Sequence, residues 1–208
     1  MTIQFFGVSC FKITTKIGNE EVSLVTDPYS AKLGKLPRNL AGDILTISRR
    51  THEHHNNIEA GTGENTFLIE YPGEYEVKGI PIYGIPADHE GKEDPGYHKN
   101  TMFHYIVDDM HIVHLGGCKM PLTDEQLSQL GEVDVLLVPV GGGDVLDPDT
   151  AADLVSRMEP RVVIPMHFED TAKFSKALGI KGEEMEKLKI MKKDLPAEDT
   201  KLVILTRS

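Results

Sequence analysis

The alternation of apolar and polar positions predicts short strands through the first half of the chain. Runs rich in β-branched and aromatic residues, each bounded by turn residues, predict strands at Thr2–Phe6, Cys10–Thr15, Val22–Thr26, Asp43–Ser48, Thr66–Glu70, Tyr75–Pro86, Thr101–Val107 and Met110–Leu115. The last two runs flank Asp108-Asp109, which predicts a hairpin. The segments Tyr29–Asn39 and Asp88–Lys99 are predicted loops.

Signals for helices appear only in the second half. Thr123 and Gln126 have the spacing of a capping box, and Asp147-Pro148 places an N-cap residue before a proline at the first helical position. Helices are also predicted over Ala172–Leu178 and Glu183–Lys189, and strands over Val133–Val140, Arg161–Met166 and Lys201–Thr206. Strands followed by alternating strands and helices indicate a mixed α/β fold, which we expect to be a single domain over residues 1–208.

Composition and charge exclude several classes of protein. The 208 residues are 39% hydrophobic and 26% charged, as in a globular domain with a real core. Lys plus Arg is 22 and Asp plus Glu is 33, and this net charge of −11 argues against binding to nucleic acid or anionic lipid. Two cysteines, Cys10 and Cys118, form no disulfide framework and are typical of a reducing compartment.

No stretch reaches the roughly 18 apolar residues of a membrane span, and the N-terminal segment lacks the features of a signal peptide. We therefore expect a cytoplasmic protein that has a small-molecule substrate and no nucleic-acid or membrane partner. Assembly into a homo-oligomer stays open.

Histidines gather where predicted strands end. His52, His54 and His55 directly follow the strand Asp43–Ser48, and His167 directly follows Arg161–Met166. Loops at strand ends are where sheets display functional groups, and imidazole is a usual ligand of zinc, iron and manganese. Two interpretations stay open, a metal site or a solvated loop that binds metal adventitiously. Asp27, which ends a strand before Pro28, suits either a carboxylate that holds a histidine or a plain turn.

Short sequence motifs, which follow one another in the same order along nearly the whole chain, resemble those of the metallo-β-lactamase superfamily. Within it, they are most similar to those of the small zinc-dependent hydrolases related to ascorbate phosphate lactonase. The matching segments are 6–11, 26–28, 43–48 with the histidine loop, 72–79, 99–101, 114–116, 122–126, 133–142 and 164–168. The resemblance implies a four-layer αββα sandwich with its site at one edge of the two sheets.

The family's metal site is usually built from His-x-His-x-Asp-His, a later histidine, an aspartate after His-Leu-Gly and a final histidine. By resemblance, His89 and His167 match the two later histidines and Asp27 matches a strand-end aspartate, whereas Gly117 replaces the bridging aspartate. Val8 likewise replaces a histidine of the opening phrase. The histidine loop has two registers, Arg49, Thr51, Glu53 and His54 in the first and Arg50, His52, His54 and His55 in the second. Both registers place an arginine at the first histidine, so the site is degenerate.

The resemblance leaves two main hypotheses. In the first, a metal set drawn from His52, Glu53, His54, His55, His89 and His167, supported by Asp27, binds one ion per chain and activates a water. Zinc is the expected ion, with manganese or iron as alternatives, and the substrate is a small ester, lactone, amide or phosphorylated metabolite.

In the second, the chain binds no metal and is an inactive relative that binds or regulates through an anionic ligand. Arg49 and Arg50 are the expected substrate-binding or anion-binding residues, because a guanidinium suits carboxylate or phosphate. A nuclease, the third possibility, ranks last because of the acidic net charge.

Overall fold

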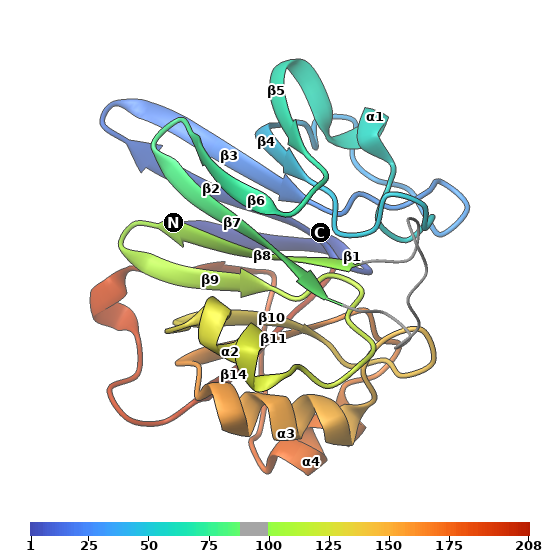
Figure 1. Ribbon diagram of the computed structural model, residues 1–208, viewed down its shortest axis with the longest axis vertical. Coiled ribbons are helices and arrows are strands. Elements are labelled where there is room, and N and C mark those ends of the chain that lie inside the picture. Colours follow the sequence, from blue (N-terminus) through green and yellow to red (C-terminus); the bar gives the residue numbers. More distant parts are fainter. Residues whose placement is uncertain (88–99) are drawn as a thin grey trace.

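The computed structural model describes residues 1–87 and 100–208, which form two β-sheets packed face to face with helices against one outer face (Figure 1). In spatial order the first sheet contains β13 (Lys187–Lys189), β1 (Thr2–Gly7), β2 (Cys10–Ile17), β3 (Glu20–Thr26), β4 (Gly42–Thr46) and β5 (Thr62–Ile69). The second contains β12 (Glu183–Met185), β14 (Lys201–Leu205), β11 (Val162–Met166), β10 (Val135–Pro139), β9 (Met110–His114), β8 (Asn100–Val107), β7 (Ile80–Ala87) and β6 (Gly73–Val77). The predicted mixed α/β class is therefore confirmed.

Alternate residues of both sheets fill the space between them. Ile3 and Phe11 project from the first sheet, and Phe103, Ile164 and Val203 from the second, and all five are fully buried. In a strand such as β2, the residues between these inward positions face the outer side of the sheet. One strand therefore contributes side chains both to the core between the sheets and to the outer face. This central core is the largest apolar cluster among the described residues.

Three helices cover the outer face of the second sheet. Figure 1 shows these helices in yellow and orange in the lower part of the view. They are α2 (Asp124–Leu130), α3 (Pro148–Met158) and α4 (Ala172–Leu178). Helix α2 begins with the predicted capping box, in which the Thr123 side chain accepts from the Gln126 backbone N–H and the Gln126 side chain accepts from the Thr123 N–H. Helix α3 begins at the predicted Asp147-Pro148 pair, and Asp147 accepts from two backbone N–H groups.

The outer face of the first sheet is covered mainly by irregular chain. A third apolar cluster, which includes Cys10, Tyr29, Leu40 and Ile47, lies beneath the segment 27–41 and α1 (Ile58–Gly61), a single helical turn. Cys10 and Cys118 are both buried and carry free thiols. The αββα arrangement therefore has a full helical layer on one side and a loop with one short helix on the other.

Two predicted elements need correction. The helix predicted over Glu183–Lys189 is wrong. This segment forms β12, which pairs with β14, and then β13, which pairs with β1. The pairing buries Leu188 in the central core, and this tertiary gain overrides the helix propensity of the Glu and Lys residues around it. The predicted strand Tyr75–Pro86 is two strands, β6 and β7, joined by a tight turn at Lys78-Gly79. The short 3₁₀ helix η1 (Lys192–Asp194) follows β13.

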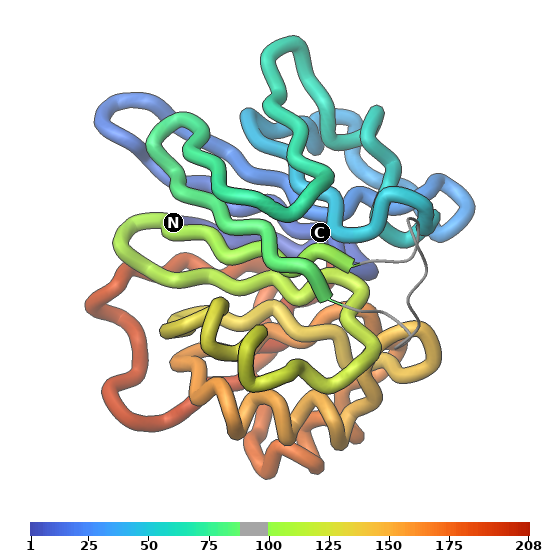
Figure 2. Tube along the Cα trace, viewed as in Figure 1, coloured from blue at the N-terminus to red at the C-terminus, as the bar shows by residue number. Residues whose placement is uncertain are grey.

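The C-terminal segment of the chain lies beside the N-terminal strand β1 (Figure 2). After β14, Arg207 forms a bridge with Phe5 of β1, which ties the end of the chain to the first sheet. The Asp108-Asp109 hairpin is confirmed, and both residues have positive φ as a two-residue type I′ turn requires. Within residues 1–87 and 100–208, the helices are all too short or too polar to span a bilayer.

Candidate metal centre

Parallel strands of both sheets end at the same edge, and the candidate residues lie in the loops that follow them. β3 runs parallel to β4, and β9, β10 and β11 run parallel to one another. Asp27 follows β3, the histidine loop follows β4, and His167 follows β11. The rule that sheets display functional groups at the carboxyl ends of parallel strands therefore explains why residues far apart in sequence meet here.

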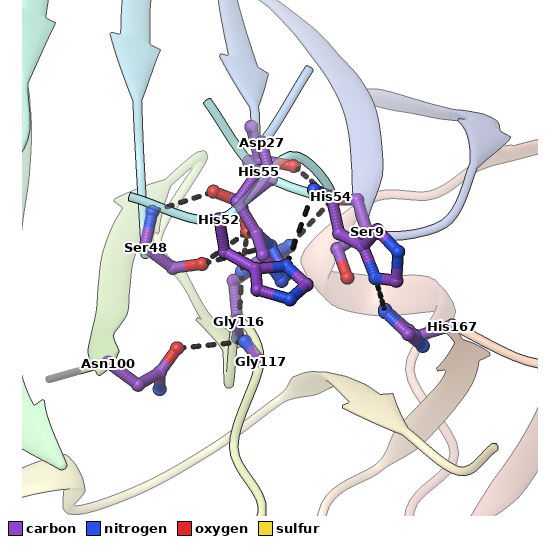
Figure 3. Close-up of polar contacts among 12 residues, drawn as sticks. Ser9, Asp27, Ser48, His52, His54, His55, Asn100, Gly116, Gly117 and His167 are labelled. Atoms are coloured by element: carbon purple, nitrogen blue, oxygen red, sulfur yellow. Dashed lines mark hydrogen bonds and ion pairs between the residues drawn. The ribbon is translucent and has the colours of Figure 1, made fainter. Parts of the chain in front are cut away.

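Four imidazoles form a cluster at this edge (Figure 3). His54 Nδ1 lies 2.8 Å from His167 Nε2, so the two rings share a hydrogen bond. The ring centroids of His52 and His54 are 4.5 Å apart, and the ring centroids of His55 and His167 are 6.0 Å apart. His52, His54 and His167 are partly exposed, whereas His55 is fully buried.

Asp27 holds His55 from the inner side of the cluster. The Asp27 carboxylate accepts hydrogen bonds from the Ser48 backbone N–H (2.6 Å) and hydroxyl (2.5 Å), and its Oδ2 lies 3.0 Å from His55 Nδ1. Donation by Nδ1–H places the lone pair of the ring on His55 Nε2, which lies on the side of Gly117, and carboxylate–histidine pairs of this kind orient metal ligands. Burial raises the pKa of Asp27 to about 6, and the charge of His114 and the bonds from Ser48 oppose this rise.

Three residues outside the predicted set complete the inner wall. His114 is fully buried, and its Nδ1 accepts from the Gly116 N–H, so its Nε2–H donates to the Ser9 carbonyl at 2.9 Å. Asn100 accepts from the Gly117 N–H and donates to the Leu115 carbonyl. The third is Ser48, whose position directly before the histidine loop was the available signal. His114 also ends a strand, but the sequence does not show that its ring turns inward.

His54 and His167 are held in the neutral form that binds metal. Burial, followed by the neighbouring His55 and His54, lowers the pKa of His167 to about 3. The pKa of His54 is also lowered, chiefly by burial, although Asp144 and Glu53 act in the opposite direction. At neutral pH these side chains need release no proton to act as ligands, but the hydrogen shared by His54 Nδ1 and His167 Nε2 must move to the other nitrogen of its own ring before both facing nitrogens can bind an ion.

The backbone around the cluster is strained. Val8 (φ 54°), Asp27 (φ 39°) and His167 (φ 53°) adopt the left-handed region, and the His167 N–H donates to the Val8 carbonyl. This conformation is a genuine outlier for a β-branched residue such as Val8. Such strain persists only where the surrounding structure enforces it, and it is common at functional sites.

The other predicted site residues lie around the cluster or outside it. Glu53 is exposed, and its carboxylate forms an ion pair with Lys32 at 3.2 Å. Arg50 is also exposed, with its Nε 3.2 Å from Glu70 and its guanidinium over the Tyr71 ring. Arg49, by contrast, is only 6% exposed. His89 lies outside the residues that the structure describes.

The cluster opens into a cavity of about 730 Å³. His54 and His167 line it together with the apolar side chains of Val8, Val140 and Phe168 and with Lys173. This volume lies within the range of small-molecule sites. The glycine segment 141–143 also borders the cavity through Gly141 and Gly142, so it helps to shape the site.

The two imidazole nitrogens on the cavity side could reach a common metal ion after a small adjustment. Two imidazole nitrogens on one tetrahedral zinc lie about 3.3 Å apart, given Zn–N bonds of about 2.0–2.1 Å. The 2.8 Å between His54 and His167 would need to widen by about 0.5 Å. Within 1–87 and 100–208, no group of three His, Cys, Asp or Glu side chains already surrounds a common point suited to an ion. The fit is therefore that of two neutral imidazoles facing a cavity, with solvent or substrate as the remaining ligands.

Comparison with known proteins places this geometry in a family. The family model described as a beta-lactamase superfamily domain matches residues 2–167. A UPF0173 metal-dependent hydrolase from Pyrococcus abyssi is 33% identical over 80% of this chain and 81% of its own length. Another from Thermococcus onnurineus is 27% identical over 87% and 93%.

Among solved structures, the chain resembles a protein from Thermotoga maritima described as a candidate zinc-dependent hydrolase of the metallo-β-lactamase superfamily. The identity is 29%, the TM-score is 0.78, and the alignment covers 98% of this chain and 97% of the other. The chain therefore belongs to the metallo-β-lactamase superfamily.

Proposed function

We propose that this protein is a metal-dependent hydrolase that uses one divalent ion held by His54 and His167 at the mouth of the cavity. The observation that carries the proposal is the 2.8 Å pair of neutral imidazoles that line a cavity of about 730 Å³. Zinc is the ion that suits this donor set best, with manganese and iron as alternatives. His52 is the nearest further imidazole to His54.

The residues of the chain prepare the site for hydrolysis. A bound divalent ion supplies Lewis acidity, which lowers the pKa of a water and polarises a carbonyl or phosphoryl oxygen. His54 and His167 enter this role already neutral, and Asp27 fixes the ring of His55 beside them. Val8, Val140 and Phe168 offer the apolar contacts that would hold a substrate and exclude bulk water.

The relatives support the reaction class and leave the substrate open. Proteins similar to this chain are described as metal-dependent hydrolases, and kinship within a fold does not carry a substrate with it. The cavity volume suits a small ester, lactone, amide or phosphorylated metabolite.

Hydrolysis by purified, zinc-loaded protein tests the proposal. A panel of nitrophenyl esters, lactones, amides and phosphoesters should contain at least one substrate, and His167→Ala should lower kcat/KM for it by at least about 100-fold. His111→Ala is the matched control, because His111 belongs to a different imidazole pair, with His104 at 2.9 Å. Equal activity in wild type and His167→Ala, or no turnover of any member of the panel, would contradict the proposal.

A second candidate function, an anion-binding module without catalysis, is favoured by one observation. Arg49 carries its charge in a nearly buried position beside the cluster. This alternative expects phosphate or acetate to raise the Tm of metal-free protein while zinc leaves the Tm unchanged. The hydrolase expects the opposite pattern, so one thermal-shift series separates the two functions.

A further inference from the structure

The imidazole cluster has two sides with different surroundings. On the outer side, His54 and His167 line the cavity. On the inner side, His55 and Arg49 both pack against the backbone of Gly117, in the loop that follows β9. A metal ion could therefore approach His54 and His167 from the cavity, whereas the inner side of the cluster is occupied by His55, Arg49 and Gly117.

Gly117 and Arg49 fit one another closely. A Cβ added at Gly117 would lie 2.7 Å from Arg49 Cδ and 2.9 Å from His55 Nε2, both closer than real Cβ contacts. Gly117 is buried, and its N–H donates to the Asn100 side chain at 2.8 Å, so its backbone has little freedom to retreat. The space that a side chain at position 117 would need is taken by the stem of Arg49.

Arg49 brings a permanent positive charge to this inner side. An arginine stays protonated at every pH at which the protein is folded, and this one is 6% exposed. Burial raises the pKa of Asp27 and lowers the pKa of His54, and the charge of Arg49 opposes the first change and adds to the second. A fixed cation that packs beside Gly117 and His55 disfavours another cation at the same place, most strongly where water is excluded.

We propose that Arg49 closes the inner side of the cluster to metal, so that the centre accepts one divalent ion on the cavity side, and that Arg49 weakens the binding of that ion. This inference rests on the proposed function, because it concerns the same site. It assigns Arg49 as a positioning residue that limits how many ions bind and where they bind, and Gly117 as the position whose missing side chain makes room for it.

Calorimetric titration of metal-free protein with zinc alone tests the inference. Wild type should saturate at about one ion per chain. Arg49→Gln should bind zinc about tenfold more tightly or accept a second ion, because removal of a nearby like charge favours the cation. Arg49→Lys keeps the charge and should behave as wild type. Arg50→Gln is the matched control, since the neighbouring Arg50 is exposed and pairs with Glu70.

Arg49→Met retains much of the stem without the charge, and it replaces Arg49→Gln if that variant fails to fold. Two ions on wild type, or unchanged zinc affinity and stoichiometry in both uncharged variants, would overturn the inference. Its failure differs from that of the proposed function. One ion on wild type and tighter binding in Arg49→Gln, without hydrolysis of any substrate, would remove the proposed function and leave the role of Arg49 in place.

Discussion

Substitution of Gly117 by alanine is the sharpest test of how the inner side of the site is packed. The new methyl carbon would lie 2.7 Å from Arg49 Cδ, whereas ordinary van der Waals contacts begin at 3.4 Å, so Arg49 must retreat by about 0.7 Å. Overpacking of a buried position costs about 1–3 kcal/mol, and the lower backbone entropy of alanine in the unfolded chain returns about 0.4–1 kcal/mol. The net expectation is a loss of about 1–2 kcal/mol.

For a chain of this length, such a loss lowers the Tm by about 3–6 °C. Thermal and urea unfolding of chelator-treated protein measure it, because bound metal would add its own stabilisation. A double-mutant cycle with Arg49→Ala identifies the cause. Once the arginine stem is gone, Gly117→Ala should cost at least about 1 kcal/mol less than in the wild-type background.

Gly63→Ala provides the control. A Cβ at Gly63 would meet its nearest neighbour at 3.5 Å, an ordinary contact, and we expect no loss of stability. The reasoning is refuted if Gly117→Ala is as stable as wild type, or if its cost is the same with and without Arg49.

Three further predictions test other parts of the account. Asp147→Ala removes the N-cap of α3 and should cost about 1 kcal/mol in urea unfolding; no change would contradict the capping role. Burial, with His111 beside it, lowers the pKa of His104 from 6.5 to about 4, so the stability that His104 contributes is present above about pH 6.5 and is lost as the pH falls towards 4. Between pH 7 and 4.5, wild type should lose about 2 kcal/mol more than His104→Gln, and parallel pH curves would refute this. Leu188→Ala should cost about 2–3 kcal/mol and Lys187→Ala under about 0.5 kcal/mol, whereas equal effects would contradict the strand β13.

Elements with local chemical signals could be predicted closely from the sequence. Helix α4 has the predicted bounds, Ala172–Leu178, and α3 begins at Pro148 as its N-cap signal indicates. The Asp108-Asp109 hairpin forms because two residues that tolerate positive φ stand between β-rich runs. In each case the residues that decide the structure are neighbours in the chain.

Elements decided by distant partners could not be predicted. β12 and β13 carry mostly Glu, Lys and Met, which favour a helix locally, yet each strand pairs with a different sheet. Helix α1 is a single turn without a side-chain cap, so it has no signal in the sequence. Here tertiary pairing outweighs intrinsic propensity.

The site shows the same division. That His54, His55, His167 and Asp27 follow strands is visible in the sequence, but their meeting depends on which strands are neighbours and run parallel. Arg49 and Arg50 are adjacent and chemically identical, and only the packing against Gly117 distinguishes the buried one from the exposed one. Their predicted roles, and those of the histidines as ligands, remain predictions.

The metal content of the purified protein tests the central claim most directly. Untagged protein, loaded with zinc, dialysed and analysed by inductively coupled plasma mass spectrometry, should retain about one ion per chain, and His54→Ala and His167→Ala should each retain far less than His111→Ala. This result would support a single-ion centre on the cavity side of the cluster. No retained zinc in wild type, two ions per chain, or full retention in His167→Ala would contradict it.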